Sequence, residues 1–170
     1  PWVLFGATLF NPHAIYYSIH GSYWEWAPPD TGWRQPYFAH YKGFADYVSR
    51  LCYLLSQGAH VVEIAVLHPS ATIHAYMGFG GPDAAATEAA NTYWEIQRSL
   101  QKNRLDYIIM DEDSLLRARV RQGTLEAGSV RIRVLFLPAA RVLTGKALEK
   151  ILTFQTSGGY VVIVGPSPDA

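Results

Sequence analysis

The residues best suited to chemistry lie in one aromatic stretch. Residues 16–38 read YYSIHGSYWEWAPPDTGWRQPYF and follow neither a helical nor a strand period. The stretch holds Trp24, Trp26 and Trp33, and a buried indole needs a partner for its N–H. Aromatic faces with polar side chains between them are typical of a sugar-binding cleft, which is the explanation we favour. The alternative is that the rings pack this loop against a neighbouring domain, and the two explanations can hold for different rings.

Ionisable side chains accompany these rings. Glu25 lies between two tryptophans, and apolar neighbours favour the protonated form that a general acid needs. Glycosidases use two carboxylates, so Glu25 is a candidate for catalysis, although an acid followed by an arginine such as Arg34 more often forms an ion pair. His13 is a better candidate for binding a substrate hydroxyl. Arg34 joins it as a candidate for substrate binding.

Two predicted elements position this loop. Val3–Phe10 is an apolar run that indicates a short buried strand, which places His13 just past the strand's C-terminal end. Residues 37–57 then show a helical period with one broad apolar face, and Gly58 supplies the stop. Composition changes from ring-rich to Val-, Ile- and Leu-rich between Gly58 and Val61. This change predicts a domain boundary there.

Strands and helices alternate after His60. Strands are predicted over VVEIAVLHPS (61–70), DYIIM (106–110), VRIRVLFLP (130–138) and YVVIVG (160–165), and helices over 83–103 and 144–158. Residues 71–81 are predicted as a loop, residues 111–116 as a short helical turn, and residues 119–129 as a small hairpin with Gly123 at its tip. The alternation predicts a parallel sheet with helices on both faces.

Other motifs have ordinary explanations. His68 and His74 are close enough to form a metal pair, but no third ligand has a suitable spacing. The acidic residues 111–113 follow a predicted strand, and helix N-capping explains them. The glycines within residues 78–81 lack the dinucleotide-binding fingerprint. Cys52 is the single cysteine, which excludes an intramolecular disulfide. We therefore predict no metal and no cofactor.

The charge and hydropathy of the chain limit the kinds of molecule that it could bind. The chain carries 14 basic and 14 acidic side chains without a basic stripe, which argues against nucleic acid and anionic membranes. Its apolar runs are far shorter than a membrane span. The chain opens on the apolar run PWVLFGATLF and ends directly after a predicted strand, so we expect it to be a piece of a longer protein. The residues assign no cellular compartment.

Three stretches carry a resemblance to a known family. They are GATLFNPHAIYYSIHG (6–21), APPDTGWRQPYFAHYKGFADYVSRLCYLLSQGAHVVEIAVLHPS (27–70) and YVVIVG (160–165). In these stretches the chain resembles large bacterial glycoside hydrolases of the α-L-rhamnosidase type (family 106). Such enzymes carry the active site on a (β/α)₈ barrel, followed by a flavodoxin-like domain of the class I glutamine amidotransferase shape, as also found in family 42 β-galactosidases.

The resemblance implies a division of the chain. Residues 1–58 would be the last strand, active-site loop and last helix of the barrel, and residues 59–170 a truncated, non-catalytic flavodoxin-like domain. His13 and Tyr17 would act on the substrate side, because residues 13–18 match the family's His-x-x-x-Tyr-Ser pattern. The family's catalytic carboxylates lie on earlier strands. The amidotransferase nucleophile is missing, because Cys52 falls within a predicted helix.

Two functions are therefore open. The favoured one is part of a glycoside hydrolase that cleaves plant or microbial polysaccharides or oligosaccharides, rhamnosides or β-galactosides, with this piece supplying one aromatic wall of the sugar site. Its partners would be a carbohydrate substrate, the rest of the same polypeptide, and further copies bound through the flavodoxin-like domain. The alternative is a non-catalytic α/β module whose aromatic loop recognises a carbohydrate or a protein.

Overall fold

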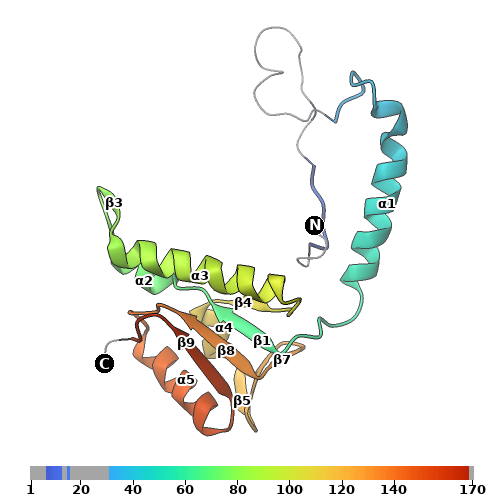
Figure 1. Ribbon diagram of the computed structural model, residues 1–170. Helices are drawn as coiled ribbons and strands as arrows, with labels where there is room; N and C mark the ends of the chain where they lie inside the picture. Colours follow the sequence, from blue (N-terminus) through green and yellow to red (C-terminus); the bar gives the residue numbers. More distant parts are fainter. Residues whose placement is uncertain (1–6, 13–14, 16–30, 169–170) are drawn as a thin grey trace. The chain divides into compact units, whose positions relative to one another are not determined.

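The computed structural model describes residues 7–12, 15 and 31–168 (Figure 1). The chain divides into two compact units, Pro1–Gly58 and Ala59–Ala170. In its described part the first unit contains one helix and no strand, and residues 7–10 of the strand predicted over 3–10 belong to no regular element. The assignment of this unit to the end of a (β/α)₈ barrel stays a prediction.

Helix α1 (Phe38–Ser56) confirms the helical period of the sequence. It ends before Gly58, whose φ of 80° is a left-handed conformation that glycine adopts without strain. Lys42 and Asp46, one turn apart, form an exposed ion pair with 2.6 Å between Nζ and Oδ2. None of the helix residues is buried, although its apolar face is broad.

The second unit is built on a sheet of four parallel strands. They are β1 (Ile64–Leu67), β4 (Ile108–Met110), β8 (Val134–Pro138) and β9 (Tyr160–Val164). Their order across the sheet is β4-β1-β8-β9, and every neighbouring pair runs parallel. The predicted parallel sheet is confirmed. Hydrophobic runs such as IAVL and VLFLP suit strands that are covered on both faces.

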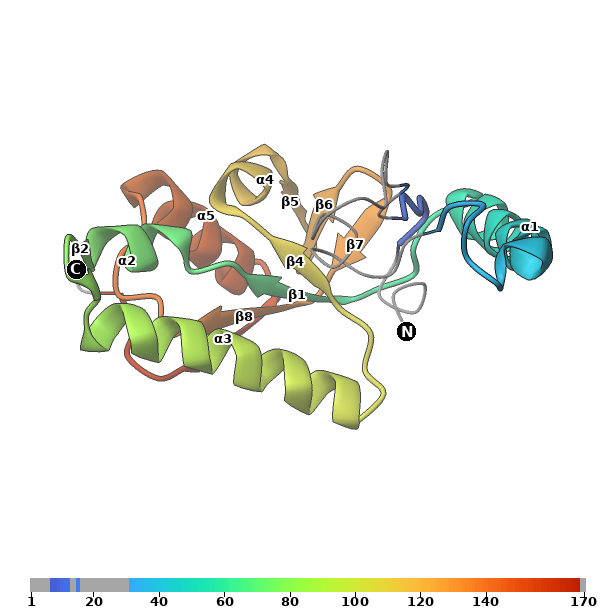
Figure 2. The same ribbon diagram turned by 90° about the horizontal axis from the view of Figure 1, so that it is seen from above.

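Helices cover both faces of this sheet (Figure 2). Helix α3 (Ala84–Lys102) lies on one face, while α4 (Glu112–Arg117) and α5 (Gly145–Thr156) lie on the other. The chain moves one way from β1 to β4 and the opposite way from β4 to β8 and β9. Because crossovers are right-handed, this reversal transfers the connecting helices to the opposite face.

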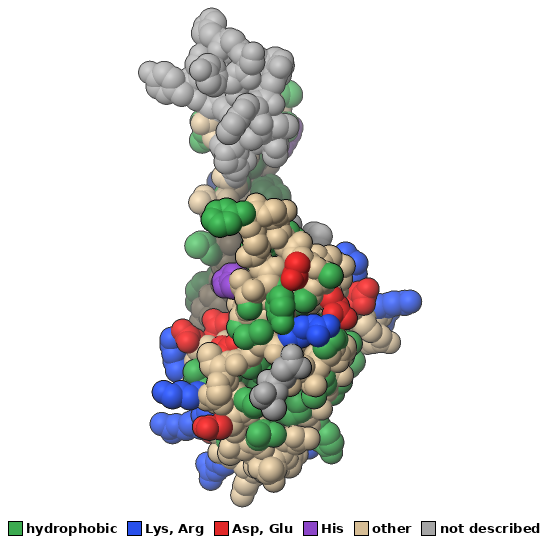
Figure 3. Space-filling model, turned by 90° about the vertical axis from the view of Figure 1, so that its left-hand side faces the viewer, with side chains coloured by type: hydrophobic (Ala, Val, Ile, Leu, Met, Phe, Trp, Pro, Cys, Tyr) green, Lys and Arg blue, Asp and Glu red, His purple; other side chains and the backbone are tan. Residues whose placement is uncertain are grey.

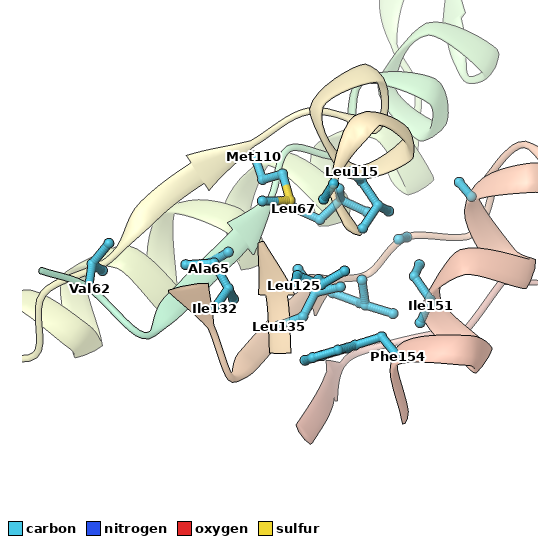
Figure 4. Close-up of a cluster of buried hydrophobic side chains, with 14 residues drawn as sticks. Val62, Ala65, Leu67, Met110, Leu115, Leu125, Ile132, Leu135, Ile151 and Phe154 are labelled. Atoms are coloured by element: carbon cyan, nitrogen blue, oxygen red, sulfur yellow. The ribbon is translucent and has the colours of Figure 1, made fainter. Parts of the chain in front are cut away.

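Each sheet face contributes to its own core. Ala65 and Leu67 of β1 face the larger cluster, which includes Leu115 of α4 and Phe154 of α5 (Figure 4). Val66 points the other way, into a smaller cluster under α3. The side chains of a strand alternate between its faces, so one short strand serves both cores. Hydrophobic side chains on both faces of β1 therefore stabilise the second unit.

The predicted hairpin belongs to a separate antiparallel sheet. It consists of β5 (Arg119–Arg121), β6 (Thr124–Ala127) and β7 (Val130–Ile132), with Gly123 at the first turn. The prediction of one strand over residues 130–138 is wrong, because β7 and β8 are separate strands. The backbone N–H groups of Arg133 and Val134 both donate to the carbonyl of Glu63, at 2.8 and 3.0 Å. The chain changes from one sheet to the other at this point.

The prediction of an irregular loop over residues 71–81 is also wrong. Residues there form α2 (Ser70–Ala75) and a tight hairpin of β2 (Met77–Gly78) and β3 (Gly81–Pro82). A helix of six residues is too short for its own hydrogen bonds to stabilise it, so tertiary contacts must do so. No helix in the described ranges has both the length and the apolarity that a membrane crossing requires.

Candidate functional site

The predicted sugar-binding residues are only partly covered by the structure. His13, Tyr17, Trp24, Glu25 and Trp26 lie outside the described residues. Trp33 and Arg34 are described, and both lie before α1 in the first of two successive turns, each closed by one hydrogen bond. In these bonds the N–H of Gln35 donates to Gly32 (3.1 Å) and that of Phe38 donates to Gln35 (3.0 Å).

Trp33 and Arg34 form a stacked pair. The guanidinium carbon of Arg34 lies 4.7 Å from the centroid of the indole, a cation–π distance. The Trp33 side chain is 67 % exposed, so the ring is available to a ligand. An aromatic face can hold the apolar face of a sugar ring, and a guanidinium donates hydrogen bonds in a fixed planar array. This pair therefore has the chemistry that one wall of a sugar site needs.

A second group of polar side chains lies at the carboxyl end of β1, where open α/β sheets bind ligands. The N–H of His68 donates to the carbonyl of Met110 at 2.8 Å. Its Nδ1 lies 2.6 Å from the hydroxyl of Ser70, and its ring meets the edge of Tyr93 at 4.9 Å between centroids. Burial, together with the nearby Tyr107, raises the pKa of Tyr93 above its usual value.

The two histidines that the sequence suggested as a metal pair lie in different surroundings. His68 is engaged by Ser70 and Tyr93, whereas His74 lies in the last turn of α2. Within the described ranges, no three His, Cys, Asp or Glu side chains form a metal-binding group. The contact between His68 and Ser70 was not predicted, although a serine two residues after a histidine could have indicated it. Tyr93 is 25 residues away in sequence from His68, and only the packing of α3 on the sheet brings the two rings together.

The acidic residues after β4 cap helices, as predicted. Asp111 caps α4 by accepting from the N–H of Ser114 at 2.6 Å. This backbone hydrogen bond lowers the pKa of Asp111 below its usual 3.8. Glu112 accepts from the N–H and the hydroxyl of Thr144, at 3.2 and 2.8 Å, and so supports the cap of α5. That link between two helices was not visible in the sequence.

The carboxyl end of β8 has no nucleophile. Ala139 follows the strand with a φ of 42°, a left-handed conformation that is rare for a residue other than glycine, and it is fully buried. A methyl group at this sharp turn cannot attack a substrate. Cys52 lies in α1 of the first unit and is only half-buried. The described part of the second unit therefore contains no thiol.

The charges on the surface are mixed. On the face drawn in Figure 3, acidic and basic side chains are interspersed around hydrophobic ones.

A scan against models of known protein families finds no match, and a search of curated proteins finds no similar sequence.

Proposed function

We propose that this chain is part of a glycoside hydrolase of the α-L-rhamnosidase type and supplies one wall of its sugar site. Residues 1–58 would be the last strand, active-site loop and last helix of a (β/α)₈ barrel. Residues 59–170 would be the first part of a flavodoxin-like domain without catalytic residues. The observation that carries the proposal is the exposed Trp33 ring with the Arg34 guanidinium stacked on it.

The apolar face of α1 supports the barrel assignment. Helices of such barrels pack one apolar face against the strands they surround. Exposed apolar side chains on α1 include Phe44, Tyr47, Leu54 and Leu55. A helix with this face needs a partner surface, and the strands of a barrel are such a surface.

The strand order supports the second assignment. Numbered along the chain, the parallel strands of the second unit stand in the order 2-1-3-4. Flavodoxin-like domains have the order 2-1-3-4-5, with the first helix on one face and the next ones on the other. The placement of α3 opposite α4 and α5 follows this scheme. Ala139 at the end of β8 fits a domain that has kept the shape without a nucleophile.

The residues of this chain would bind the sugar rather than cleave it. His13 and Tyr17 would hydrogen-bond substrate hydroxyls, and the tryptophans would stack on a sugar ring. Glycosidic cleavage requires two carboxylates on either side of the scissile bond, and these would lie on other strands of the barrel. The substrate would be an oligosaccharide or polysaccharide containing rhamnose or β-linked galactose.

Carbohydrate binding by the chain tests this proposal. Rhamnose-containing and galactose-containing polysaccharides embedded in a native gel should retard the chain, and Trp33→Ala should weaken the retardation about tenfold, the equivalent of about 1.4 kcal/mol. Trp94→Ala is the matched control, because Trp94 is 54 % exposed but lies on α3 in the second unit. Equal retardation of wild type and both variants would count against the sugar wall.

Activity measurements complete the test. The purified chain should not hydrolyse aryl glycosides, because both catalytic carboxylates would lie on other strands of the barrel. If the purified chain did hydrolyse an aryl glycoside, and Glu25→Gln abolished this activity, the placement of the catalytic carboxylates elsewhere would be overturned. Glu25 would then be a catalytic residue. The gene sequence upstream of Pro1 separates the hydrolase from a binding module, since the hydrolase requires several hundred further residues with alternating strands and helices and paired glutamates.

A further inference from the structure

Trp33 and Arg34 give the proposed sugar wall two kinds of contact. The guanidinium carbon of Arg34 lies over the indole, 4.7 Å from the ring centroid, so the guanidinium covers part of one face of the ring. Trp33 is nevertheless 67 % exposed, which leaves the opposite face open to a sugar ring. The wall therefore combines an apolar stacking surface with a cation.

The guanidinium of Arg34 suits a carboxylate better than it suits a hydroxyl. A guanidinium that stacks on a ring keeps its N–H groups for acceptors in its own plane, where they form a rigid fork. This fork matches the two oxygens of a carboxylate, and hydrogen bonds to an ionised group are about twice as strong as those between neutral groups. Because the guanidinium has five N–H donors, it can bind a carboxylate while it keeps other contacts.

Helix α1 adds positive charge next to this pair in the chain. The helix begins at Phe38, four residues after Arg34, and two successive hydrogen-bonded turns connect them. The first turn of α1 contains no acidic residue, so the positive end of the helix dipole is not offset by a carboxylate of that turn. The charge of this helix end supports an anion beside Arg34, whereas Trp33 is the residue that favours a sugar.

We propose that the wall formed by Trp33 and Arg34 binds an acidic saccharide. Arg34 covers one face of the indole and the stacked sugar takes the other, so the carboxylate that Arg34 binds belongs to the neighbouring sugar unit. The ligand is thus a rhamnose or galactose ring that stacks on Trp33 and is linked to a uronic acid. This inference rests on the proposed function and names the substrate class of the same site.

Two forms of one polysaccharide test the inference. The first is a polymer of alternating rhamnose and galacturonic acid. The second is the same polymer after its carboxylates have been reduced to alcohols, which removes the charge and keeps the linkages. In a native gel the acidic polymer should retard the purified chain at about tenfold lower concentration than the reduced polymer. Added salt should weaken retardation by the acidic polymer only.

Variants of Arg34 identify the group that reads the charge. Arg34→Gln should weaken retardation by the acidic polymer about tenfold and leave retardation by the reduced polymer unchanged, which also shows that the wall is folded. Arg34→Lys keeps the charge without the fork, so its effect should be intermediate. Arg50→Gln is the matched control, because Arg50 is exposed on α1 beyond its first turn, and it should behave as wild type.

The outcomes separate this inference from the proposed function. If Trp33→Ala weakens retardation by both polymers while Arg34→Gln affects the two polymers equally, the sugar wall stands and the acidic substrate is overturned. If Trp33→Ala changes neither retardation, the sugar wall itself fails, and the inference fails with it.

Two further results would count against recognition of a carboxylate. Equal weakening by Arg50→Gln and Arg34→Gln would mean that the acidic polymer is held by general charge attraction. A sulfated galactan is the second anionic probe. If its retardation of the chain depended on Arg34 as strongly as that of the acidic polymer, the assignment to a uronic acid would be refuted.

Discussion

Thr72 offers a sharp test of how the second unit is held together. It is fully buried in α2, and its hydroxyl serves both backbone groups of Val142 in the segment after β8. The Thr72 hydroxyl donates to the Val142 carbonyl at 3.3 Å and accepts from the Val142 N–H at 3.0 Å. One side chain therefore joins the segments that follow β1 and β8, where the strand order of the sheet reverses.

Replacing Thr72 with valine keeps the shape and removes both hydrogen bonds. Val142 is only partly buried, so its N–H costs about 1 kcal/mol when it loses this partner, and the second, longer bond adds less than 1 kcal/mol. We expect Thr72→Val to lower the free energy of unfolding by about 1–2 kcal/mol. Thr72→Ser keeps the hydroxyl and loses one methyl group, so it should cost about 1 kcal/mol.

Urea unfolding of the full chain, followed by far-UV circular dichroism, measures both variants against wild type. Equal denaturant dependence of the three proteins would show that only the native-state stability has changed. The reasoning is refuted if Thr72→Val is as stable as wild type, or if Thr72→Ser is the more damaging substitution. Either result would mean that Val142 finds other partners and that α2 is held by apolar packing alone.

Two further predictions concern α5 and α4. A Cβ added at Gly159 would overlap the buried ring of Phe154, so Gly159→Ala should destabilise the chain by about 1–3 kcal/mol. Gly145 lies in open space at the start of α5, so Gly145→Ala should stabilise the chain by up to about 1 kcal/mol. Thermal unfolding of both variants measures these changes. The lowered pKa of Asp111 means that its contribution is present above pH 3.8 and lost as the pH falls through its folded-state value. The stability difference between wild type and Asp111→Asn should therefore fall as the pH drops below 3.8, and a pH-independent difference would contradict this cause.

Elements with strong local signals were predictable from the sequence. The apolar period of α1 and the glycine after it mark that helix, and Asp83 caps α3 by accepting from the N–H groups of Ala85 and Ala86. Thr144 caps α5 in the same way. These signals are local, because caps and periodicity act within one or two helical turns. The alternation of strands and helices likewise predicted the parallel sheet.

For the candidate site, the sequence supplied the residue types. Trp33 and Arg34 are neighbours in the chain, so a stacked pair was within reach of sequence reasoning, and the pair is present. The environment of His68 was not predictable, because Tyr93 reaches it only through the packing of α3 on the sheet. The Glu112 link to Thr144 also joins residues that are distant in the chain.

The sequence by itself determined helices α1, α3, α4 and α5, their caps and the parallel character of the sheet, because these depend on neighbouring residues and on hydrophobic period. Tertiary structure alone decided the order β4-β1-β8-β9, the formation of α2, and the break between β7 and β8. Each of these depends on long-range contacts, such as Thr72 with Val142 and Glu63 with Arg133. Such contacts have no local period, so they exist only once the chain has packed.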